Sequence, residues 1–349
     1  ININVPALDP PTDLDFVSTA VTCLALTSDV TLTATNGVGP FTYEIISPII
    51  VVPQPSNVFS GLTPDTYVFR VTDANGCYYE ESYTVDPVTN ITVSGALMND
   101  VSCNGGSNGA VDFTVSNFAG TYSYTINGGP SVVGQSAATI NLTGLAIGNQ
   151  TIVVTDETTG CTATVTILVS EPTVLTLVET TNINANCNFG AQLTVTAGGG
   201  TPNYTYAFVQ DLVIPIASDY TASSSAVLDP AVNVNWDVWV MDANGCTTQI
   251  DVVIATDPLP TIAPIAPQCF TGTPISITLV EGTGIAITPL TYSIGGAYLV
   301  SPTFSINAAG TYDVFIKDGN GCIATTTYDV QSPLLLDANM TQDLTCIVD

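Results

Sequence analysis

The spacing of the cysteines is the strongest constraint that this sequence places on its fold. One type of cysteine precedes a strand-like run and recurs at intervals of 80, 84, 82 and 77 residues: Cys23, Cys103, Cys187, Cys269 and Cys346. A second type ends an Asp-containing turn, as in VTDANGC at 71–77, and comprises Cys77, Cys161, Cys246 and Cys322. This periodicity predicts a tandem array of small domains of one kind.

Prolines mark the bounds of the repeated units. Each unit closes on an acid or a serine followed by proline, at Asp86-Pro87, Glu171-Pro172, Asp257-Pro258 and Ser332-Pro333. These dipeptides predict immunoglobulin-like repeats at 11–87, 88–172, 173–258 and 259–333. Residues 1–10 are interpreted as the end of a preceding repeat and 334–349 as the start of a following one, so the chain is expected to be part of a longer array.

Within each unit, apolar side chains alternate with polar ones over short segments separated by Gly, Pro, Asn and Asp. In the second unit these segments are 91–95, 110–115, 122–126, 138–142, 150–156 and 161–169. No window shows helical periodicity. Six or seven short strands in about 80 residues predict an all-β fold: a tandem array of immunoglobulin-like antiparallel β-sandwich repeats.

An aromatic residue opens the penultimate strand of three repeats. These residues are Tyr67, Trp236 and Tyr312, while Gln150 stands at this place in the second repeat. An aromatic at this position resembles the tyrosine corner of β-sandwiches, and it is also compatible with a ring that fills the core.

The charge balance excludes whole classes of partner. Thirty acidic residues face only Arg70 and Lys317, there is no His, and the formal net charge is −28. Binding to nucleic acid or to anionic lipid needs clustered basic residues, so neither is expected. No run of 18 apolar residues occurs, so no membrane insertion of this fragment is expected.

Enzymatic activity is not expected either. Most general-base, nucleophile and phosphate-handling arrangements need His, Lys or Arg in numbers that this chain lacks. Phosphate-binding glycine loops and Cys-x-x-Cys zinc motifs are absent, and no carboxylate pair stands out among the scattered acids. We therefore predict no catalytic residues.

The second repeat resembles a known family of surface repeats. Its opening VSCNGGSNGAVDFTVS (101–116), the Tyr-x-Tyr strand that follows, and the Val-x-Asp-x-x-Gly-Cys close seen in the other repeats are similar to the SprB repeat. The other openings, CLALTSD, CNFGAQ and CFTGTP, keep only the Cys and part of the turn. The resemblance implies Ig-like or PKD-like modules of giant adhesins of gliding Bacteroidetes, exported through type IX secretion to the cell surface.

The Asp-x-Asn-Gly stretch has two interpretations. It suits a tight hairpin turn, in which the Asx side chain caps the turn and Gly takes a positive φ. It also resembles a fragment of a calcium loop, although the downstream acids of such a loop are missing. The turn is favoured, and Ca²⁺ is the only cofactor considered, with weak candidates Asp73, Asn75, Asp242, Asn244, Asp318 and Asn320. Junction acids Asp86, Glu171 and Asp257 are a separate calcium hypothesis.

Paired cysteines in an exported repeat chain favour disulfides over metal sites, and free thiols are the least favoured alternative. Pairing within units would join Cys23–Cys77, Cys103–Cys161, Cys187–Cys246 and Cys269–Cys322. However, the two cysteines of one unit are expected at opposite ends of a sandwich, roughly 25–30 Å apart, whereas a disulfide needs Cα atoms within about 7 Å. Pairing between neighbouring repeats is therefore slightly favoured: Cys23–Cys161, Cys103–Cys246 and Cys187–Cys322.

These observations predict a structural stalk segment of a large secreted cell-surface adhesin that positions a distal binding element for adhesion or gliding motility. The expected partners are neighbouring repeats of the same chain, with surface glycans or substratum bound by other parts of the protein. Two alternatives stay open, a subunit of an extracellular filament and an array of glycan-binding modules. The ligand is unknown, and the aromatic residues available for glycans are Trp236, Trp239, Tyr204, Tyr206 and Phe315.

Overall fold

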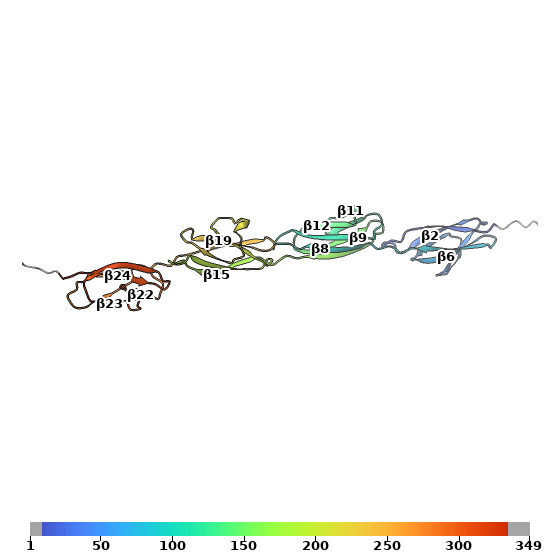
Figure 1. The fold of residues 1–349 in the computed structure, drawn as a ribbon. Helices are drawn as coiled ribbons and strands as arrows, with labels where there is room; N and C mark the ends of the chain where they lie inside the picture. Colours follow the sequence, from blue (N-terminus) through green and yellow to red (C-terminus); the bar gives the residue numbers. More distant parts are fainter. Residues whose placement is uncertain (1–8, 334–349) are drawn as a thin grey trace, which may run out of the picture. The chain divides into compact units, whose positions relative to one another are not determined.

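The computed structural model describes residues 9–333, which form antiparallel sheets and one short 3-10 helix (Figure 1). The chain divides into two compact units, Ile1–Pro172 and Thr173–Asp349. Each unit contains two groups of strands, and each group encloses its own cluster of buried residues. The all-β array of Ig-like sandwiches expected from the sequence is therefore confirmed, while the predicted repeat bounds stay a prediction.

The first repeat is a seven-stranded sandwich. Its two sheets have the orders β1-β2-β5 and β4-β3-β6-β7. Leu32, Ile45 and Phe69 come from both sheets and are fully buried between them. The strands are β1 (Asp13–Ser18), β2 (Ser28–Thr35), β3 (Thr42–Ser47), β4 (Val51–Gln54), β5 (Val58–Leu62), β6 (Asp65–Thr72) and β7 (Tyr78–Val85).

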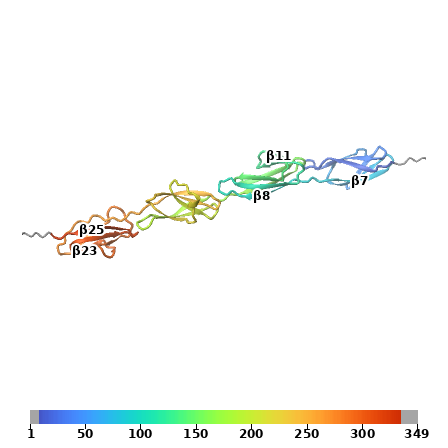
Figure 2. The same ribbon diagram turned by 45° about the horizontal axis from the view of Figure 1, so that its top comes forward.

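The second repeat has the same topology, with sheets β12-β9-β8 and β11-β10-β13-β14. Figure 2 shows β8 and β11 on opposite sides of this repeat. The six predicted strands are present, but β11 is missing from the prediction because Gly and Pro interrupt the stretch 128–134. The strands are β8 (Thr92–Asn99), β9 (Gly109–Ser116), β10 (Tyr122–Ile126), β11 (Val132–Gln135), β12 (Thr139–Leu145), β13 (Gly148–Asp156) and β14 (Thr162–Val169).

The third repeat pairs sheets β15-β16-β18 and β17-β19-β20. A short helix, η1, follows β17 where the first two repeats have a strand. The elements are β15 (Thr176–Ile183), β16 (Ala191–Gly198), β17 (Thr205–Gln210), η1 (Ala217–Asp219), β18 (Ser225–Leu228), β19 (Asn235–Met241) and β20 (Thr247–Val253).

The fourth repeat is the most reduced of the four, with sheets β21-β23 and β22-β24-β25. A single bridge between Ile262 and Glu281 stands where the other repeats pair their first strand. The strands are β21 (Ile275–Thr278), β22 (Thr291–Ser293), β23 (Thr303–Ile306), β24 (Gly310–Lys317) and β25 (Ile323–Val330).

The residue that opens the penultimate strand ties this strand to the preceding loop. The hydroxyl of Tyr67 donates to the carbonyl of Thr63 at 2.7 Å, and Tyr312 donates to Ala308 at 2.8 Å, four residues upstream in both cases. Trp236 makes a similar bond through its ring N–H. These contacts are the tyrosine corner that the sequence indicates, and the aromatic rings also border the core, so the two interpretations hold together.

This corner predicts a graded loss of stability. Tyr67→Phe keeps the buried ring and removes one partly buried hydrogen bond, which should lower the unfolding free energy of the first repeat by about 1 kcal/mol. Tyr312→Phe, whose hydroxyl bond is exposed, should cost clearly less. Amide hydrogen exchange of peptides from each repeat would measure both changes, and equal losses would contradict the burial argument.

Candidate functional site

A buried carboxylate organises each Asp-containing turn. In the first repeat, Oδ1 of Asp73 accepts backbone N–H bonds from Asn75 and Cys77, each at 2.9 Å. The same pair of bonds recurs at Asp242 and Asp318. Because the carboxylate accepts the backbone N–H of the cysteine itself, it fixes the position of the cysteine backbone and therefore of its Cβ. The hairpin-turn interpretation of VTDANGC is confirmed.

The second oxygen of this carboxylate reaches a different loop. Oδ2 of Asp73 accepts the backbone N–H of Val38 at 3.3 Å. In the same way, Oδ2 of Asp156 accepts the N–H of Ala119 at 2.7 Å, and Oδ2 of Asp242 accepts that of Thr201 at 2.8 Å. The turn is thereby fastened to the loop before the Tyr-containing strand. Asp318 lacks this partner, and its Oδ2 is buried without a hydrogen bond.

Asp156 adapts the turn to an insertion. The second repeat replaces Asn-Gly by a longer stretch, and Oδ1 of Asp156 accepts the N–H groups of Thr158 and Thr159 at 2.8 and 3.0 Å. Burial raises the pKa of the Asp156 carboxyl, but the hydrogen bonds from Ala119, Thr159 and Thr158 together outweigh it, so the pKa lies below its usual value. The charged form is the one that the fold stabilises.

The first type of cysteine lies at the C-terminal end of its repeat, as the sequence analysis expects. In the second repeat, the N–H of Val101 donates to Ser170 at 2.9 Å. The side chain of Asn104 donates to Glu171 at 2.8 Å and to the carbonyl of Pro172 at 3.0 Å. The Asn of the Cys-Asn-Gly-Gly motif thus fastens the cysteine turn to the last residues of the repeat, a role that the sequence did not reveal.

The first junction is closed by a disulfide between Cys23 and Cys161, with Cα atoms 5.0 Å apart. The backbone N–H of Cys23 also donates to the carbonyl of Thr159 at 3.0 Å. Leu24 packs against Gly160, whose φ of 69° favours glycine, and a Cβ at this position would lie 2.9 Å from the leucine side chain. Cys161 belongs to the core of the second repeat, so the bond is anchored inside a packed domain.

The second observed junction joins Cys187 to Cys322, with Cα atoms 5.7 Å apart. Asn188 donates to the carbonyl of Asn320 at 2.8 Å. Asp257 accepts side-chain bonds from Asn184 and Asn320, both at 2.8 Å, and so connects the end of one repeat with the turn of the next. Hydrogen bonds therefore support the covalent link on both sides.

These two bonds decide part of the pairing question. Pairing between neighbouring repeats is confirmed for Cys23–Cys161 and Cys187–Cys322. Pairing within a unit is wrong for the repeats involved, because the two cysteines of one sandwich lie at opposite ends of it. The Cys103–Cys246 bridge stays a prediction, Cys77 and Cys269 have no disulfide partner among residues 9–333, and Cys346 lies outside the described residues.

The calcium candidates make other contacts. Backbone N–H groups occupy Oδ1 of Asp73, Asp242 and Asp318. Asn244 and Asn320 donate their side-chain amides to Thr201 and Asp257. In the described part of the chain no three His, Cys, Asp or Glu side chains are grouped to hold a metal. Calcium binding stays an untested prediction.

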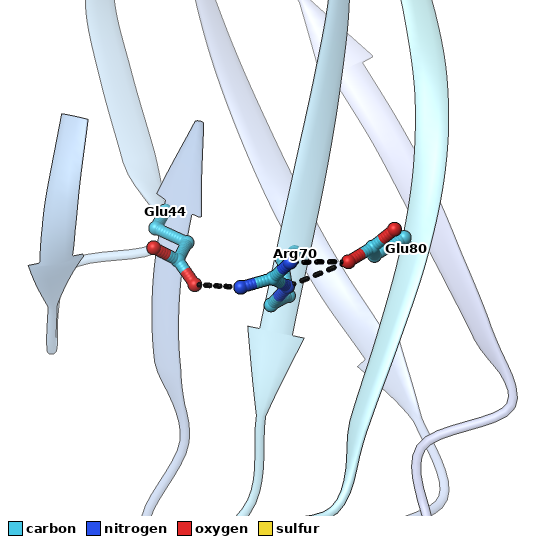
Figure 3. A network of polar contacts seen from close by, with 3 residues as sticks. All are labelled: Glu44, Arg70 and Glu80. Atoms are coloured by element: carbon cyan, nitrogen blue, oxygen red, sulfur yellow. Dashed lines mark hydrogen bonds and ion pairs between the residues drawn. The ribbon is translucent and has the colours of Figure 1, made fainter. Parts of the chain in front are cut away.

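Both basic side chains are engaged. Arg70 forms ion pairs with Glu44 at 3.1 Å and with Glu80 at 2.5 Å across three neighbouring strands (Figure 3). The ammonium group of Lys317 lies 4.2 Å from the ring centre of Tyr298.

The aromatic residues considered for glycan binding serve the fold to different degrees. Tyr206 is buried, and Tyr204 and Trp236 are half-buried against the core of the third repeat. Trp239 is half-buried with an unpaired ring N–H, and Phe315 packs edge-on against Tyr298. They do not form one common platform, since Phe315 belongs to another repeat.

Comparisons with known proteins confirm the resemblance for the second repeat: residues 98–131 match the SprB repeat. Comparison with functionally curated proteins gave no match. None of the described residues forms a helix that is long and apolar enough to span a membrane.

The chain is similar to several solved structures, each at low sequence identity and low TM-score. Three N-terminal domains of the Hoc capsid protein of bacteriophage RB49 match at 13% identity and a TM-score of 0.37, over 70% of this chain and 100% of that one. The human desmocollin-1 ectodomain matches at 15% identity and 0.24, over 93% and 78%. Protocadherin gamma B2 domains 3–6 match at 14% identity and 0.29, over 88% and 96%.

The disulfide pattern yields a direct chemical prediction. Peptide mapping of the non-reduced chain by mass spectrometry should recover the pairs Cys23–Cys161, Cys187–Cys322 and Cys103–Cys246. The third pair follows because Cys103 and Cys246 occupy the same motif positions as the two observed pairs. Recovery of a Cys103–Cys161 peptide would contradict the account.

The Asp156 turn predicts a specific dependence on pH. Its folded pKa is lowered, so its stabilising effect is present above the unfolded pKa of about 3.9 and disappears as the pH falls through the folded value. In the Asp156→Asn variant, the side-chain NH2 group replaces the oxygen that accepts the Ala119 N–H, so two donors face each other. The substitution should destabilise the second repeat by about 1–3 kcal/mol at pH 6.

Hydrogen exchange of second-repeat peptides at pH 6 and in acid, measured with matched correction for intrinsic exchange, would test this. The difference between Asp156→Asn and the parent should shrink as the pH falls through the lowered pKa of Asp156. Asp112→Asn is a matched control, because Asp112 has one exposed side-chain partner, Asn141. A difference that is the same at both pH values would contradict the charge-based explanation.

Proposed function

We propose that this segment is a structural stalk of a large secreted cell-surface adhesin, which holds a distal binding element away from the cell for adhesion or gliding motility. The observation that carries the proposal is the disulfide that joins one repeat to the next rather than closing a single domain. A bridge that served only the stability of one sandwich would have both cysteines inside it.

The bridges change how a pulling force passes through the chain. Cys23–Cys161 closes a loop with a sequence separation of 138, and Cys187–Cys322 closes one of 135. A load applied to the ends crosses each loop through the sulfur atoms, so the enclosed strands bear little of it. A segment that keeps its length under load is what a stalk requires.

The export route and the setting are part of the proposal. Disulfides persist in oxidising surroundings outside the cytosol, and the SprB match over 98–131 supports an adhesin-type repeat. Gliding and type IX secretion rest on the family resemblance alone. A non-catalytic role is supported by the engagement of Arg70 and Lys317 and by the lack of His in the sequence.

A second candidate, saccharide binding, is favoured by one feature. A hollow of about 500 Å³ lies where the first and second repeats meet, lined by polar groups such as Thr89 and Asn117 together with the rings of Tyr83 and Phe118. Hydroxyls beside an aromatic ring suit a neutral sugar. Chemical-shift changes confined to this hollow on titration with neutral oligosaccharides would support the candidate, and none at millimolar sugar would remove it.

The stalk proposal predicts a locked length under force. When single oxidised chains are pulled from their ends, residues 23–161 and 187–322 should not extend. Reduction should release roughly 480 Å of additional contour length from each loop. Single-molecule force spectroscopy with and without a reductant measures the difference.

The Cys23→Ser/Cys161→Ser double variant is the matched control, since it should release only the first loop without reductant. Full extension of the oxidised parent chain would refute the mechanical role, whatever the ligand of the adhesin is.

A further inference from the structure

Each repeat exposes a short aliphatic segment in the stretch that follows strand β3, β10, β17 or β22; in the first two repeats this stretch includes the edge strands β4 and β11. Scattered exposed aliphatic side chains are ordinary, but their recurrence at one topological position in four repeats is not accounted for by the fold. We name these segments the aliphatic tips. Their exposed members are Ile49, Ile50 and Val52; Val132 and Val133; Leu212, Val213, Ile214 and Ile216; Leu299 and Val300.

The tips contribute nothing to the cores. Ile50, Ile214 and Val300 are each about 80% exposed, at 81%, 80% and 81%. None of them belongs to the four clusters of buried residues. Their hydrophobic surface stays in contact with water unless another surface covers it, and covering it is favourable in proportion to its area.

The backbone of the tips is held by hydrogen bonds, so the side chains are presented in a fixed way. In the third repeat the N–H of Leu212 donates to the buried carboxylate of Asp237 at 3.0 Å. In the fourth, Tyr292 and Leu299 exchange two backbone bonds of 2.8 Å. In the second, Gly134 donates to Glu157 at 2.9 Å. Little ordering is therefore needed when a tip binds.

Charge is excluded from the tips although the chain carries −28. The segments 45–64, 113–155 and 282–312 around three of them contain no Asp, Glu, Lys or Arg. The third tip lies between Asp211 and Asp219, and the Asp219 carboxylate accepts the N–H of Ile216. Two charged groups from other segments lie beside the tips, and both have partners: Glu157 accepts hydrogen bonds from Thr121 and Gly134, and Lys317 lies over the ring of Tyr298. The exposed tip side chains themselves are uncharged, so covering them does not require removing water from an unpaired ion, which would cost several kcal/mol.

A second copy of the chain is a poor occupant. Two chains of charge −28 repel each other, and no basic patch offsets the repulsion. Strand addition at the first tip is also disfavoured, because the edge strand β4 has only four residues and contains Pro53, which has no N–H to donate. An anionic surface is disfavoured for the same electrostatic reason.

The geometry points to a binding activity of the array itself: the aliphatic tips dock on an uncharged, apolar surface, such as a solid coated with hydrocarbon. One weak contact per repeat adds up along the chain, since linked sites bind with a raised effective concentration. This inference goes beyond the stalk role and does not depend on it, because the tips contain no cysteine and lie outside the bridged turns.

The test uses the oxidised full chain and gold sensors coated with methyl-terminated or hydroxyl-terminated alkanethiols. A quartz crystal microbalance measures the concentration for half-saturation. The tip variant carries Ile50→Gln, Val133→Gln, Ile214→Gln and Val300→Gln. The control variant changes one aliphatic of each repeat that lies outside the tips and is more than half exposed: Val17→Gln, Leu168→Gln, Val253→Gln and Ile323→Gln.

We expect the parent to bind the methyl surface and to bind the hydroxyl surface far less. The tip variant should need at least about ten times more protein for half-saturation, and the control variant less than twice as much. Hydrogen exchange confirms that both variants are folded.

Equal binding of the parent to both surfaces, or equal losses in the two variants, would overturn the inference. Concentration-dependent self-association of the parent in sedimentation velocity, lost in the tip variant, would assign the tips to a second copy and overturn it as well. If the oxidised chain keeps its length under force but shows no preference for the methyl surface, the docking role of the tips is refuted and the stalk role is not.

Discussion

The hydrogen bonds that a buried Asp makes in each turn are the interaction on which the rest of the array depends. In the first, third and fourth repeats one carboxylate oxygen accepts the cysteine N–H, as in Asp318 and Cys322. In the second repeat Asp156 holds Thr159, whose hydroxyl accepts the N–H of Cys161. In the first three repeats the other carboxylate oxygen fastens the turn to a neighbouring loop. The cysteine is thus held at the N-terminal end of its sandwich. A disulfide tolerates only a narrow range of Cα distances, so this placement is a precondition for bonding the preceding repeat.

The bridges then make two sandwiches act together. Each sandwich is small, and a small domain buries a modest core. In the chain-entropy model, a bond that closes a loop of 138 or 135 residues stabilises the folded state by about 5 kcal/mol. The same bond limits bending between neighbours, and contacts such as Leu24 against Gly160 or Asn188 with Asn320 support it from the side.

The sequence predicts the fold well because its signals are local. Alternation of apolar residues places β9, β10 and β13, and the cysteine period gives the array. The pairing of Cys23 with Cys161 could be favoured only by a distance argument, since it depends on which end of a sandwich each turn occupies. Two tertiary contacts could not be predicted, because they depend on loop positions that no periodicity encodes. These are the hydrogen bonds of Asn104 to the end of its repeat and the bond from the N–H of Ala119 to Asp156. Strand β11 was not predicted, because the glycine and proline residues next to it are typical of turns.

The central claim is that a bridge turns two neighbouring repeats into one mechanical body. Nitrogen-15 relaxation of residues 9–172 tests it most directly, by comparing the rotational correlation times of the first and second repeats. With Cys23–Cys161 intact, both repeats should share one correlation time and one diffusion tensor, and after reduction the two should separate towards the shorter values of single domains. Independent tumbling in the oxidised state, or unchanged common tumbling after reduction, would contradict the account.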